Sequence, residues 1–403
     1  MPFALYLLAL AVFAQGTSEF MLSGLVPDIA HDLRVSVPAA GSLTSAYAVG
    51  MVVGAPLMAV MALRWSRRRA LLTFLIVFLL VHVVGAVTTS FGLLLATRAV
   101  GALAGAGFLA VAVATAAGMV PPDAKGRATS VLLGGVTVAC VAGVPAGALL
   151  GQAWGWRSAF WAVALISVPA VLAILRSVPP GTADGAEGGP GARGEARALR
   201  DPRLLVVLLL GALVNGATFC AFTYLAPLVT AVTGMGAGAV PVVLALFGAG
   251  SFAGVTLAGR LADRRPGRVL AVGGSALLLG WIALAFAAGD PVAVCVLVFV
   301  QGALSFGVGS TLISQVLYVA VGAPRLAGGF ATAALNVGAA VGPWAGGVAI
   351  GSGLGFRSPL WVSASLVAVA LAVALAGACA AHLTGRGAAA HRTGGAAATR
   401  AGR

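Results

Sequence analysis

The stretch ALLTFLIVFLLVHVVGAVT, from Ala70 to Thr88, is nineteen residues long and contains no Asp, Glu, Lys or Arg. About 20 consecutive apolar residues suffice for a helix to cross the hydrocarbon core of a bilayer. Similar runs recur along the chain between short connections rich in Pro, Gly and Arg. We place them near residues 3–25, 40–62, 70–88, 92–118, 128–151, 157–175, 204–230, 240–259, 268–288, 291–320, 326–350 and 358–380. The pattern predicts an all-α membrane protein with twelve transmembrane helices.

The composition excludes a water-soluble enzyme of this size. Of the 403 residues, 60% are hydrophobic and 8% are charged, whereas soluble domains carry about 25% charged residues. The 57 glycines suit close packing of helices in lipid. All four cysteines lie in apolar runs without CxxC spacing, so we interpret them as packing residues and expect neither a metal site nor a cofactor.

The positions of the basic residues predict the orientation in the membrane. With the N-terminus inside, twenty of the 24 Lys and Arg residues fall in cytoplasmic connections or in the C-terminal tail. Arg34, Arg157 and Arg357 fall outside, and Arg98 lies within the fourth span. Because basic residues concentrate on the cytoplasmic side, we expect both termini in the cytoplasm and the chain in the cell membrane. Although the formal net charge is +14, it is spread along one membrane face, which argues against a nucleic-acid partner.

An internal repeat divides the chain into two halves. The sequences GWRS at 155–158 and GFRS at 355–358 open the sixth and twelfth spans at an offset of 200 residues. The second and eighth spans close at the same offset, with GAPLMAVMALR at 54–64 and GVTLAGRLADR at 254–264. We therefore predict two pseudo-symmetric six-helix bundles.

The connection between the bundles has a different composition. It contains PPGTADGAEGGPGARGEA, a segment rich in Gly, Pro and charge that cannot bury a core. We interpret it as a disordered cytoplasmic linker. The predicted organisation is an N-terminal half at 1–175, the linker at 176–203, a C-terminal half at 204–382 and a cytoplasmic tail at 383–403.

Two parallel six-helix repeats with these motifs resemble the Major Facilitator Superfamily. GRLADRRPGR at 259–268 is similar to the family's cytoplasmic loop motif, although the first-half copy has Leu63 where an Asp is expected. Arg98 in TRAVGALAGAG resembles the fourth-helix motif. The glycine spacing at 329–347 resembles the antiporter motif, and the fifth helix carries a looser version, GVPAG, at 143–147.

A narrower resemblance concerns the first span. AQGTSEFMLSGLVPDIA at 14–30 is similar to drug-exporting members of the family, in particular actinobacterial exporters that confer chloramphenicol resistance. The resemblance implies a monomeric transporter that exchanges protons for a small neutral amphiphilic drug, chloramphenicol, by alternating access. Export of sugars or nucleosides and uncoupled facilitated diffusion remain alternatives.

Glu19 is the one acidic residue that falls clearly inside a predicted span. It forms a polar stripe with Gln15 and Ser23 at spacing i, i+4, i+8, and such a stripe must face the protein interior. Glu19 and Arg98 both lie about 9 Å below the outer membrane surface by helix rise. A carboxylate that alternates between an arginine partner and apolar burial can take up and release a proton. We predict coupling or substrate contact by Gln15, Glu19 and Arg98; the alternative is a fixed ion pair that orients helices.

Three further groups of residues are candidates for transport. Polar or aromatic residues on central spans are predicted to line the cavity, although each is individually typical of helix packing: Tyr47, Asn215, Thr218, Phe222, Tyr224, Gln301, Ser305 and Asn336. Residues predicted to form a cytoplasmic gate are Arg260, Asp263, Arg264 and Arg268. Residues predicted to serve close helix packing, with hinge motion as the alternative, are Gly143, Pro145, Gly147, Gly338, Gly342, Pro343 and Gly346. His82 is interpreted as a hydrogen-bonded helix residue, with a proton relay as the alternative.

Other energy sources and chemistries lack their motifs. The single lysine, Lys125, follows Ala124, so the chain contains no GxxxxGK[ST] loop for ATP. It also contains neither HExxH nor G-x-S-x-G. We therefore expect a transporter, and not an enzyme, whose energy comes from an ion gradient or from a partner subunit.

Overall fold

The computed structural model describes residues 3–62, 65–121, 124–178, 199–262, 266–320 and 327–377. Within these ranges the regular structure is helical throughout, and twelve helices are long and apolar enough to cross a membrane. This confirms the predicted all-α membrane fold. Of the predicted linker, 176–203, residues 179–198 lie outside the described residues, as does the predicted tail, 383–403, whereas 176–177 and 202–203 are helical.

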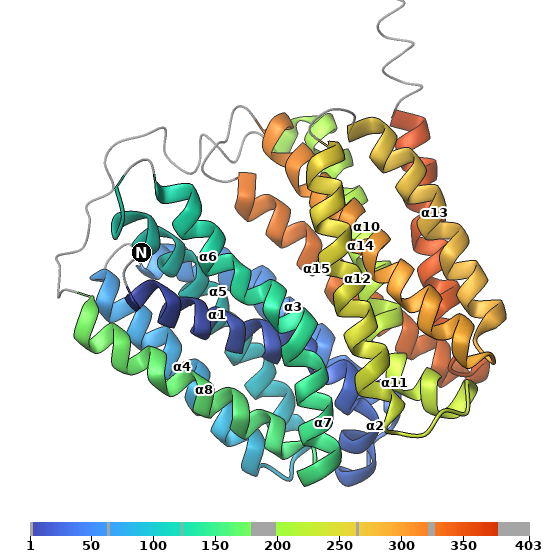
Figure 1. Cartoon of the computed structure of the whole chain (residues 1–403), viewed down its shortest axis with the longest axis horizontal. Helices are drawn as coiled ribbons and strands as arrows, with labels where there is room; N and C mark the ends of the chain where they lie inside the picture. Colours follow the sequence, from blue (N-terminus) through green and yellow to red (C-terminus); the bar gives the residue numbers. More distant parts are fainter. Residues whose placement is uncertain are drawn as a thin grey trace, which may run out of the picture.

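The first half contains six spans, several of them divided into shorter elements (Figure 1). Its elements are α1 Phe3–Phe20, α2 Leu22–Asp32, α3 Val37–Ala62, α4 Arg67–Val87, α5 Phe91–Gly118, α6 Lys125–Val138, the π-helical turn η2 Ala139–Gly143, α7 Val144–Trp154 and α8 Arg157–Ser177.

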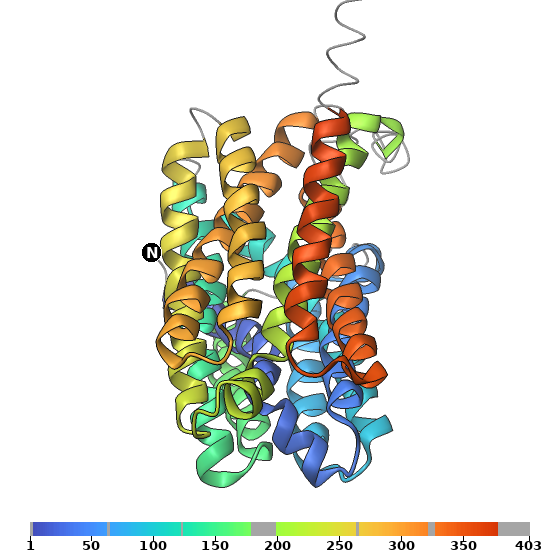
Figure 2. The ribbon, with the colours of Figure 1, turned by 90° about the vertical axis from the view of Figure 1, so that its right-hand side faces the viewer.

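The second half repeats this arrangement. Its elements are α10 Pro202–Thr223, α11 Leu225–Pro227, the π-helical turn η4 Leu228–Val232, α12 Ala239–Ala262, α13 Pro266–Ala287, α14 Pro291–Val319, α15 Ala327–Ala349, the π-helical turn η5 Ile350–Leu354 and a last helix, Ser358–Gly377. Figure 2, in which this half faces the viewer, shows its helices running roughly side by side.

The first span is interrupted, which differs from the continuous helix expected near 3–25. Helix α1 ends at Phe20, and α2 begins after Met21 and continues to Asp32. At the break, the Gly24 amide donates to the Met21 carbonyl at 3.2 Å, and the Phe20 carbonyl accepts the Ser23 hydroxyl at 2.9 Å. Pro27 lacks a backbone N–H, so the Ser23 carbonyl, four residues earlier, has no intrahelical donor. The break, at Met21, lies two residues after Glu19.

The seventh span has a matching interruption. Helix α10 ends at Thr223, Tyr224 is not helical, and the short α11 ends at Pro227. Pro27 and Pro227 are separated by the repeat offset of 200 residues. The fifth span also departs from a regular helix at η2, two residues before Pro145. Proline removes an intrahelical hydrogen bond, and π-helical turns are frequent at functional sites.

The halves pack on one another along two pairs of helices. Helix α3 lies against α15, and α12 lies against η2 and α7. Figure 1 shows the halves meeting where α2, α7 and α11 lie and diverging toward the opposite end. At the meeting end, the Gln152 amide donates to the Ala237 carbonyl at 2.6 Å. This end is therefore the one held closed in the structure.

Candidate functional site

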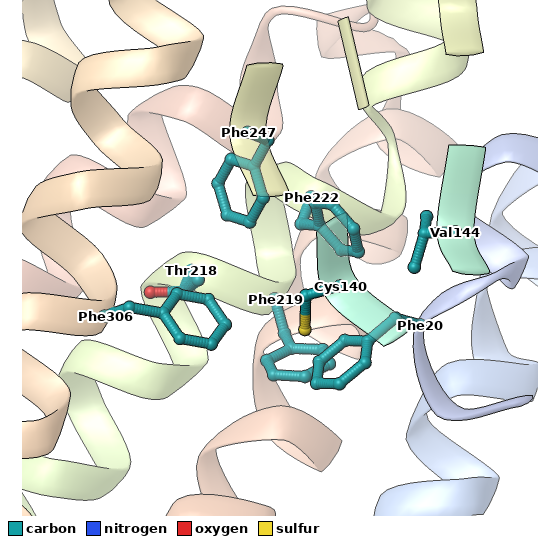
Figure 3. A pocket seen from close by; sticks show the side chains of 8 residues that line it. All are labelled: Phe20, Cys140, Val144, Thr218, Phe219, Phe222, Phe247 and Phe306. Atoms are coloured by element: carbon teal, nitrogen blue, oxygen red, sulfur yellow. The ribbon is translucent and has the colours of Figure 1, made fainter. Parts of the chain in front are cut away.

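A pocket lies between the two halves, near the middle of the divided spans. In this conformation its side chains leave free space for little more than one water molecule. Figure 3 shows its lining residues, which come from α1, η2, α7, α10, α12 and α14: Phe20, Cys140, Val144, Thr218, Phe219, Phe222, Phe247 and Phe306. Because both halves contribute, relative motion of the halves would change its shape.

Aromatic rings form a continuous contact across the pocket. The Phe20 ring, from the first half, stacks on Phe219 with centroids 5.5 Å apart and meets Phe222 edge-on at 6.3 Å. Phe222 in turn lies 4.6 Å from Phe247. Stacked and edge-to-face geometries are favourable for aromatic rings. The rings therefore fill most of the space between the halves, and an apolar or aromatic ligand could enter only after the halves move apart.

Two of the predicted cavity residues, Thr218 and Phe222, line this pocket. The Thr218 hydroxyl donates to the Val214 carbonyl within its own helix at 2.9 Å. The Cys140 thiol from η2 is the other heteroatom-bearing side chain in the lining. The walls are thus mainly apolar, with few groups available for hydrogen bonding.

The other predicted cavity residues lie on helix contacts or in the interior of one half. Asn215 donates to the Leu335 carbonyl at 2.7 Å, and the Tyr224 hydroxyl donates to the Pro343 carbonyl at 2.8 Å, so both connect α10 to α15. The Asn336 amide donates to the Thr332 carbonyl, and the Gln301 amide donates to the Leu277 carbonyl and lines a smaller pocket in the second half. Ser305 is buried and has no hydrogen-bond partner among the described residues, and the Tyr47 ring, on α3, lies against the Arg98 guanidinium.

Arg98 lies deep inside the first half. Its side chain is 2% exposed on α5. One terminal nitrogen, Nη1, donates to the Ser18 hydroxyl at 2.7 Å, and Nη2 donates to the Ser18 carbonyl at 2.8 Å. The guanidinium also lies 4.4 Å from the centroid of the Tyr47 ring. The backbone carbonyl, the hydroxyl and the aromatic face compensate part of its burial, while Nε has no hydrogen-bond partner among the described residues.

Glu19 has no comparable partner. Among the described residues, none forms a hydrogen bond or ion pair with its carboxylate, which is half-buried at the end of α1. It does interact electrostatically with Arg98, Tyr47 and Cys140, from three surrounding elements. The fixed ion pair with Arg98 is thus not formed in this state. A carboxylate without fixed donors, beside a cation and a pocket residue, is free to change its protonation.

The remainder of the predicted polar stripe is buried on the same helices. The Gln15 side chain is 6% exposed and its amide nitrogen has no hydrogen-bond partner among the described residues. Ser23 is used at the helix break, where it donates to the Phe20 carbonyl. Gln15 lies near Gly105 and Tyr47, because a Cβ added at Gly105 would lie 3.9 Å from Gln15 and 3.5 Å from the Tyr47 hydroxyl.

His82 extends the Arg98 contacts toward α4. Its Nε2 lies 2.6 Å from the Ser18 hydroxyl, and its Nδ1 lies 2.6 Å from the Phe78 carbonyl. The ring is 3% exposed and packs against Phe78 and Phe160. The side chain is therefore hydrogen-bonded inside the helix bundle at both nitrogens.

The predicted glycines and prolines lie where helices approach closely. A Cβ on Gly338 or Gly342 would overlap backbone atoms of α10, and one on Gly346 would lie 2.8 Å from the Cys220 sulfur. In the fifth span, Gly143 contacts Thr17, and a Cβ on Gly147 would lie 3.3 Å from that of Met21. Their helices also carry the two predicted prolines, Pro145 after η2 and Pro343 within α15.

The predicted cytoplasmic gate is described in part. Arg260, near the end of α12, and Arg268, in α13, are exposed. Asp263 and Arg264 lie outside the described residues. Within the described ranges no group of three or more His, Cys, Asp or Glu side chains could hold a metal ion.

An ion pair fastens the first half at the closed end. The Arg157 guanidinium donates to the Asp32 carboxylate and, at 3.0 Å, to the Thr88 carbonyl, which ties α8 to α2 and the end of α4. Trp156 donates to the same carboxylate at 3.0 Å. These donors hold the pKa of the Asp32 carboxyl below its usual value.

Four of the pocket's phenylalanines were not predicted from the sequence: Phe20, Phe219, Phe247 and Phe306. One signal was available, because Phe219 and Phe222 are three residues apart beside Thr218 and so share a helix face. Phe20 could be connected to them only by knowing how α1 faces α10. Ser18, which holds both terminal nitrogens of Arg98, was likewise missed.

Comparison with known proteins identifies the family. The Major Facilitator Superfamily profile matches residues 8–329. The chain belongs to the Major Facilitator Superfamily. A Major Facilitator relative from Streptomyces lividans, Chloramphenicol resistance protein, is 61% identical over 375 residues, which cover 93% of this chain and 96% of the relative. The Inner membrane transport protein YdhP of Escherichia coli strain K12 is 36% identical over 354 residues, 88% of this chain and 90% of the relative.

Solved Major Facilitator structures share the fold. A bacterial homolog of the human lysosomal transporter Spinster superposes with a TM-score of 0.71 at 19% identity, covering 92% of this chain and 94% of the other. A variant of the nucleoside transporter NupG gives a TM-score of 0.75 at 13% identity, covering 92% and 98%. The chain is therefore a multi-pass membrane transporter and not an enzyme, as the sequence predicted.

Proposed function

We propose that this transporter exports chloramphenicol, or a related small neutral amphiphile, in exchange for protons. The observation that carries the substrate is the 61% identity, over almost the full length of both chains, to the Chloramphenicol resistance protein of Streptomyces lividans. The residues that line the pocket between the halves suit such a molecule once the halves move apart. Its walls are largely phenylalanine with a single hydroxyl and a thiol, and such walls favour neutral ligands over charged ones.

Glu19 is proposed as the proton-coupling residue, with Arg98 and Gln15 as its polar surroundings. The carboxylate has no fixed hydrogen-bond donor among the described residues, and its neighbour Phe20 lines the pocket. An acidic group within a membrane span is costly unless it serves a function. Proton uptake would remove its charge and weaken its attraction to Arg98. Because Glu19 and Phe20 are adjacent in the chain, a movement of Glu19 on protonation would also move a residue that lines the pocket.

The proposal includes the orientation of the protein in the membrane and the side to which the described conformation opens. We propose a location in the cell membrane with both termini in the cytoplasm, because the cytoplasmic connections then hold most of the basic residues. The closed end, marked by Gln152 and Ala237, then faces outward. The described conformation would receive substrate from the cytoplasm. Since one chain supplies the whole pocket lining, we propose that it works as a monomer.

The proposal is tested by drug resistance and vesicle transport. The intact chain should raise the chloramphenicol resistance of a sensitive host, and everted vesicles should accumulate the drug when a proton gradient is imposed. Glu19→Gln should abolish gradient-driven accumulation at equal membrane abundance. Asp290→Asn is the matched control, because Asp290 is an exposed N-cap residue that does not line the pocket. Asn can cap a helix in the same way.

Three results would contradict parts of the proposal. Drug movement that ignores the proton gradient would indicate an uncoupled facilitator. Competition by sugars or nucleosides, without any by chloramphenicol, would move the substrate to another class. Full gradient-driven transport by the Glu19→Gln protein would remove Glu19 from the coupling mechanism.

A further inference from the structure

A chain of three buried hydrogen bonds connects α5, α1 and α4. Arg98 Nη1 lies 2.7 Å from the Ser18 hydroxyl oxygen, which lies 2.6 Å from His82 Nε2, while His82 Nδ1 lies 2.6 Å from the Phe78 carbonyl. Ser18, His82 and Arg98 are 0%, 3% and 2% exposed. The proposed transport cycle gives no role to Ser18 or His82.

The chemistry of the partners fixes the direction of every bond. A carbonyl oxygen only accepts, so His82 Nδ1 carries the proton that it shares with Phe78. Nε2 of the neutral ring must then accept, and the Ser18 O–H donates to it. The Ser18 oxygen is left with lone pairs directed to the Arg98 guanidinium, which always donates. With neutral His82, every hydrogen bond therefore points in one direction, from Arg98 to Ser18, from Ser18 to His82 and from His82 to the Phe78 carbonyl.

These hydrogen bonds determine where the Arg98 guanidinium lies. Both terminal nitrogens donate to Ser18, one to its hydroxyl and one to its carbonyl. Tyr47 covers the guanidinium face. Glu19, the next residue after Ser18, interacts with Arg98 electrostatically but receives no hydrogen bond from it. Ser18 thus takes one N–H from each terminal nitrogen, the two nitrogens that an end-on bidentate carboxylate would use, while Nε has no hydrogen-bond partner among the described residues.

The second half shows that the fold forms without these three hydrogen bonds. It contains the same helices, yet the network and its carboxylate are replaced at the repeat offset of 200 residues. The corresponding pairs are Ser18 and Thr218, Glu19 and Phe219, His82 and Ile282, and Arg98 and Val298. Thr218 donates to its own helix instead. The buried hydrogen bonds therefore occur in the same half of the protein as Glu19.

We infer that His82 is a positioning residue for proton coupling: acting through Ser18, it holds the Arg98 guanidinium away from the Glu19 carboxylate and so leaves that carboxylate free to exchange its proton. This inference rests on the proposed role of Glu19. It assigns no proton transfer to His82 itself. Loss of the Nε2 acceptor would free the Ser18 hydroxyl and allow Arg98 to turn toward Glu19.

The surroundings contain few other groups that could produce the same effect. Arg98 is the charged group that interacts with His82, and α8 contributes the Phe160 ring at a centroid distance of 5.9 Å. Glu19 interacts with Arg98 from α5, Tyr47 from α3 and Cys140 from η2. Of these groups, Arg98 is the permanent cation that can keep a carboxylate ionised at lower pH.

The test measures the pH dependence of drug-proton exchange in proteoliposomes. His82→Phe keeps a ring against Phe78 and Phe160 but removes the acceptor, and Ser18→Ala removes the hydroxyl that connects it to Arg98. In both variants the pH of half-maximal exchange should fall by roughly one to three pH units, the range expected when a carboxylate gains an arginine partner. His82→Gln supplies an acceptor again and should restore the wild-type profile.

The outcomes separate this inference from the proposed function. If Glu19→Gln still exchanges protons, the proposed coupling residue is wrong. If Glu19 is required but His82→Phe and Ser18→Ala keep the wild-type pH profile in correctly folded protein, the positioning role is wrong. If His82→Phe does not fold, the pH profile of Ser18→Ala alone decides the outcome.

Discussion

Substitution of Gly342 by Ala should destabilise the contact between α10 and α15. A Cβ at this position would overlap the Gly216 carbonyl oxygen and lie 2.8 Å from its carbon and 3.0 Å from its Cα. All three atoms are backbone, so no flexible side chain can move aside. Small residues allow such close approach of helices in membranes, where packing replaces the hydrophobic effect as the driving force.

The expected magnitude follows from that overlap. Carbon atoms are in favourable contact at about 3.5–4.0 Å, so the carbonyl carbon alone requires a local separation of about 0.7–1.2 Å, and the nearer carbonyl oxygen requires more. Overpacking of this kind costs about 1–3 kcal/mol. Gly309→Ala is a matched control, since a Cβ there meets nothing within 4 Å inside α14. Removing a glycine from an open helix position should be neutral or stabilise by up to about 1 kcal/mol.

Thermal unfolding in a mild detergent, followed by circular dichroism, measures both variants. We expect the Gly342→Ala protein to unfold at a lower temperature than the wild type, and the Gly309→Ala protein at an equal or higher one. Equal stability of the wild type and Gly342→Ala would show that α10 and α15 are not in the close contact described. A stable Gly342→Ala protein with impaired transport would favour the hinge interpretation of this glycine over the packing one.

Three further predictions concern the pocket and the closed end. Phe222→Leu should raise the chloramphenicol concentration for half-maximal export by roughly two- to tenfold, through loss of aromatic contact worth about 0.5–1.5 kcal/mol; uptake assays in everted vesicles measure this. Chloramphenicol should slow maleimide labelling of Cys140, which lines the pocket, and unchanged labelling would place the drug elsewhere. Asp32→Asn should destabilise the protein at pH 7 by less than about 1 kcal/mol, because the pair with Arg157 is partly exposed. The pKa of Asp32 is lowered by folding, so its contribution should disappear as the pH falls through that lowered value, and melting curves of both proteins should then converge.

The number and approximate bounds of the spans could be predicted because they depend on local properties of the chain. The span expected at 291–320 is observed as Pro291–Val319, since length and hydropathy alone decide insertion. The interruptions after Phe20 and Thr223 were not predicted. Pro227 leaves the Thr223 carbonyl without an intrahelical donor, and Pro27 does the same to Ser23 within α2; these matched prolines were the available signal.

Side-chain partners were harder to predict than helices. The sequence placed Glu19 and Arg98 at similar depth, but depth does not fix the rotation of a helix about its axis. A rotation of one residue, about 100°, separates Ser18 from Glu19 and decides which of them receives the guanidinium. The phenylalanines of the pocket come from four different helices, so their meeting depends on how the two halves pack.

The central claim is that Glu19 exchanges a proton each time the drug crosses. The most direct measurement records proton movement inside sealed proteoliposomes, with a trapped pH indicator, after a chloramphenicol gradient is imposed. We predict drug-dependent proton flux with the wild type and with Asp290→Asn, and none with Glu19→Gln although that protein still binds the drug. Equal proton flux from Glu19→Gln and the wild type would contradict the claim.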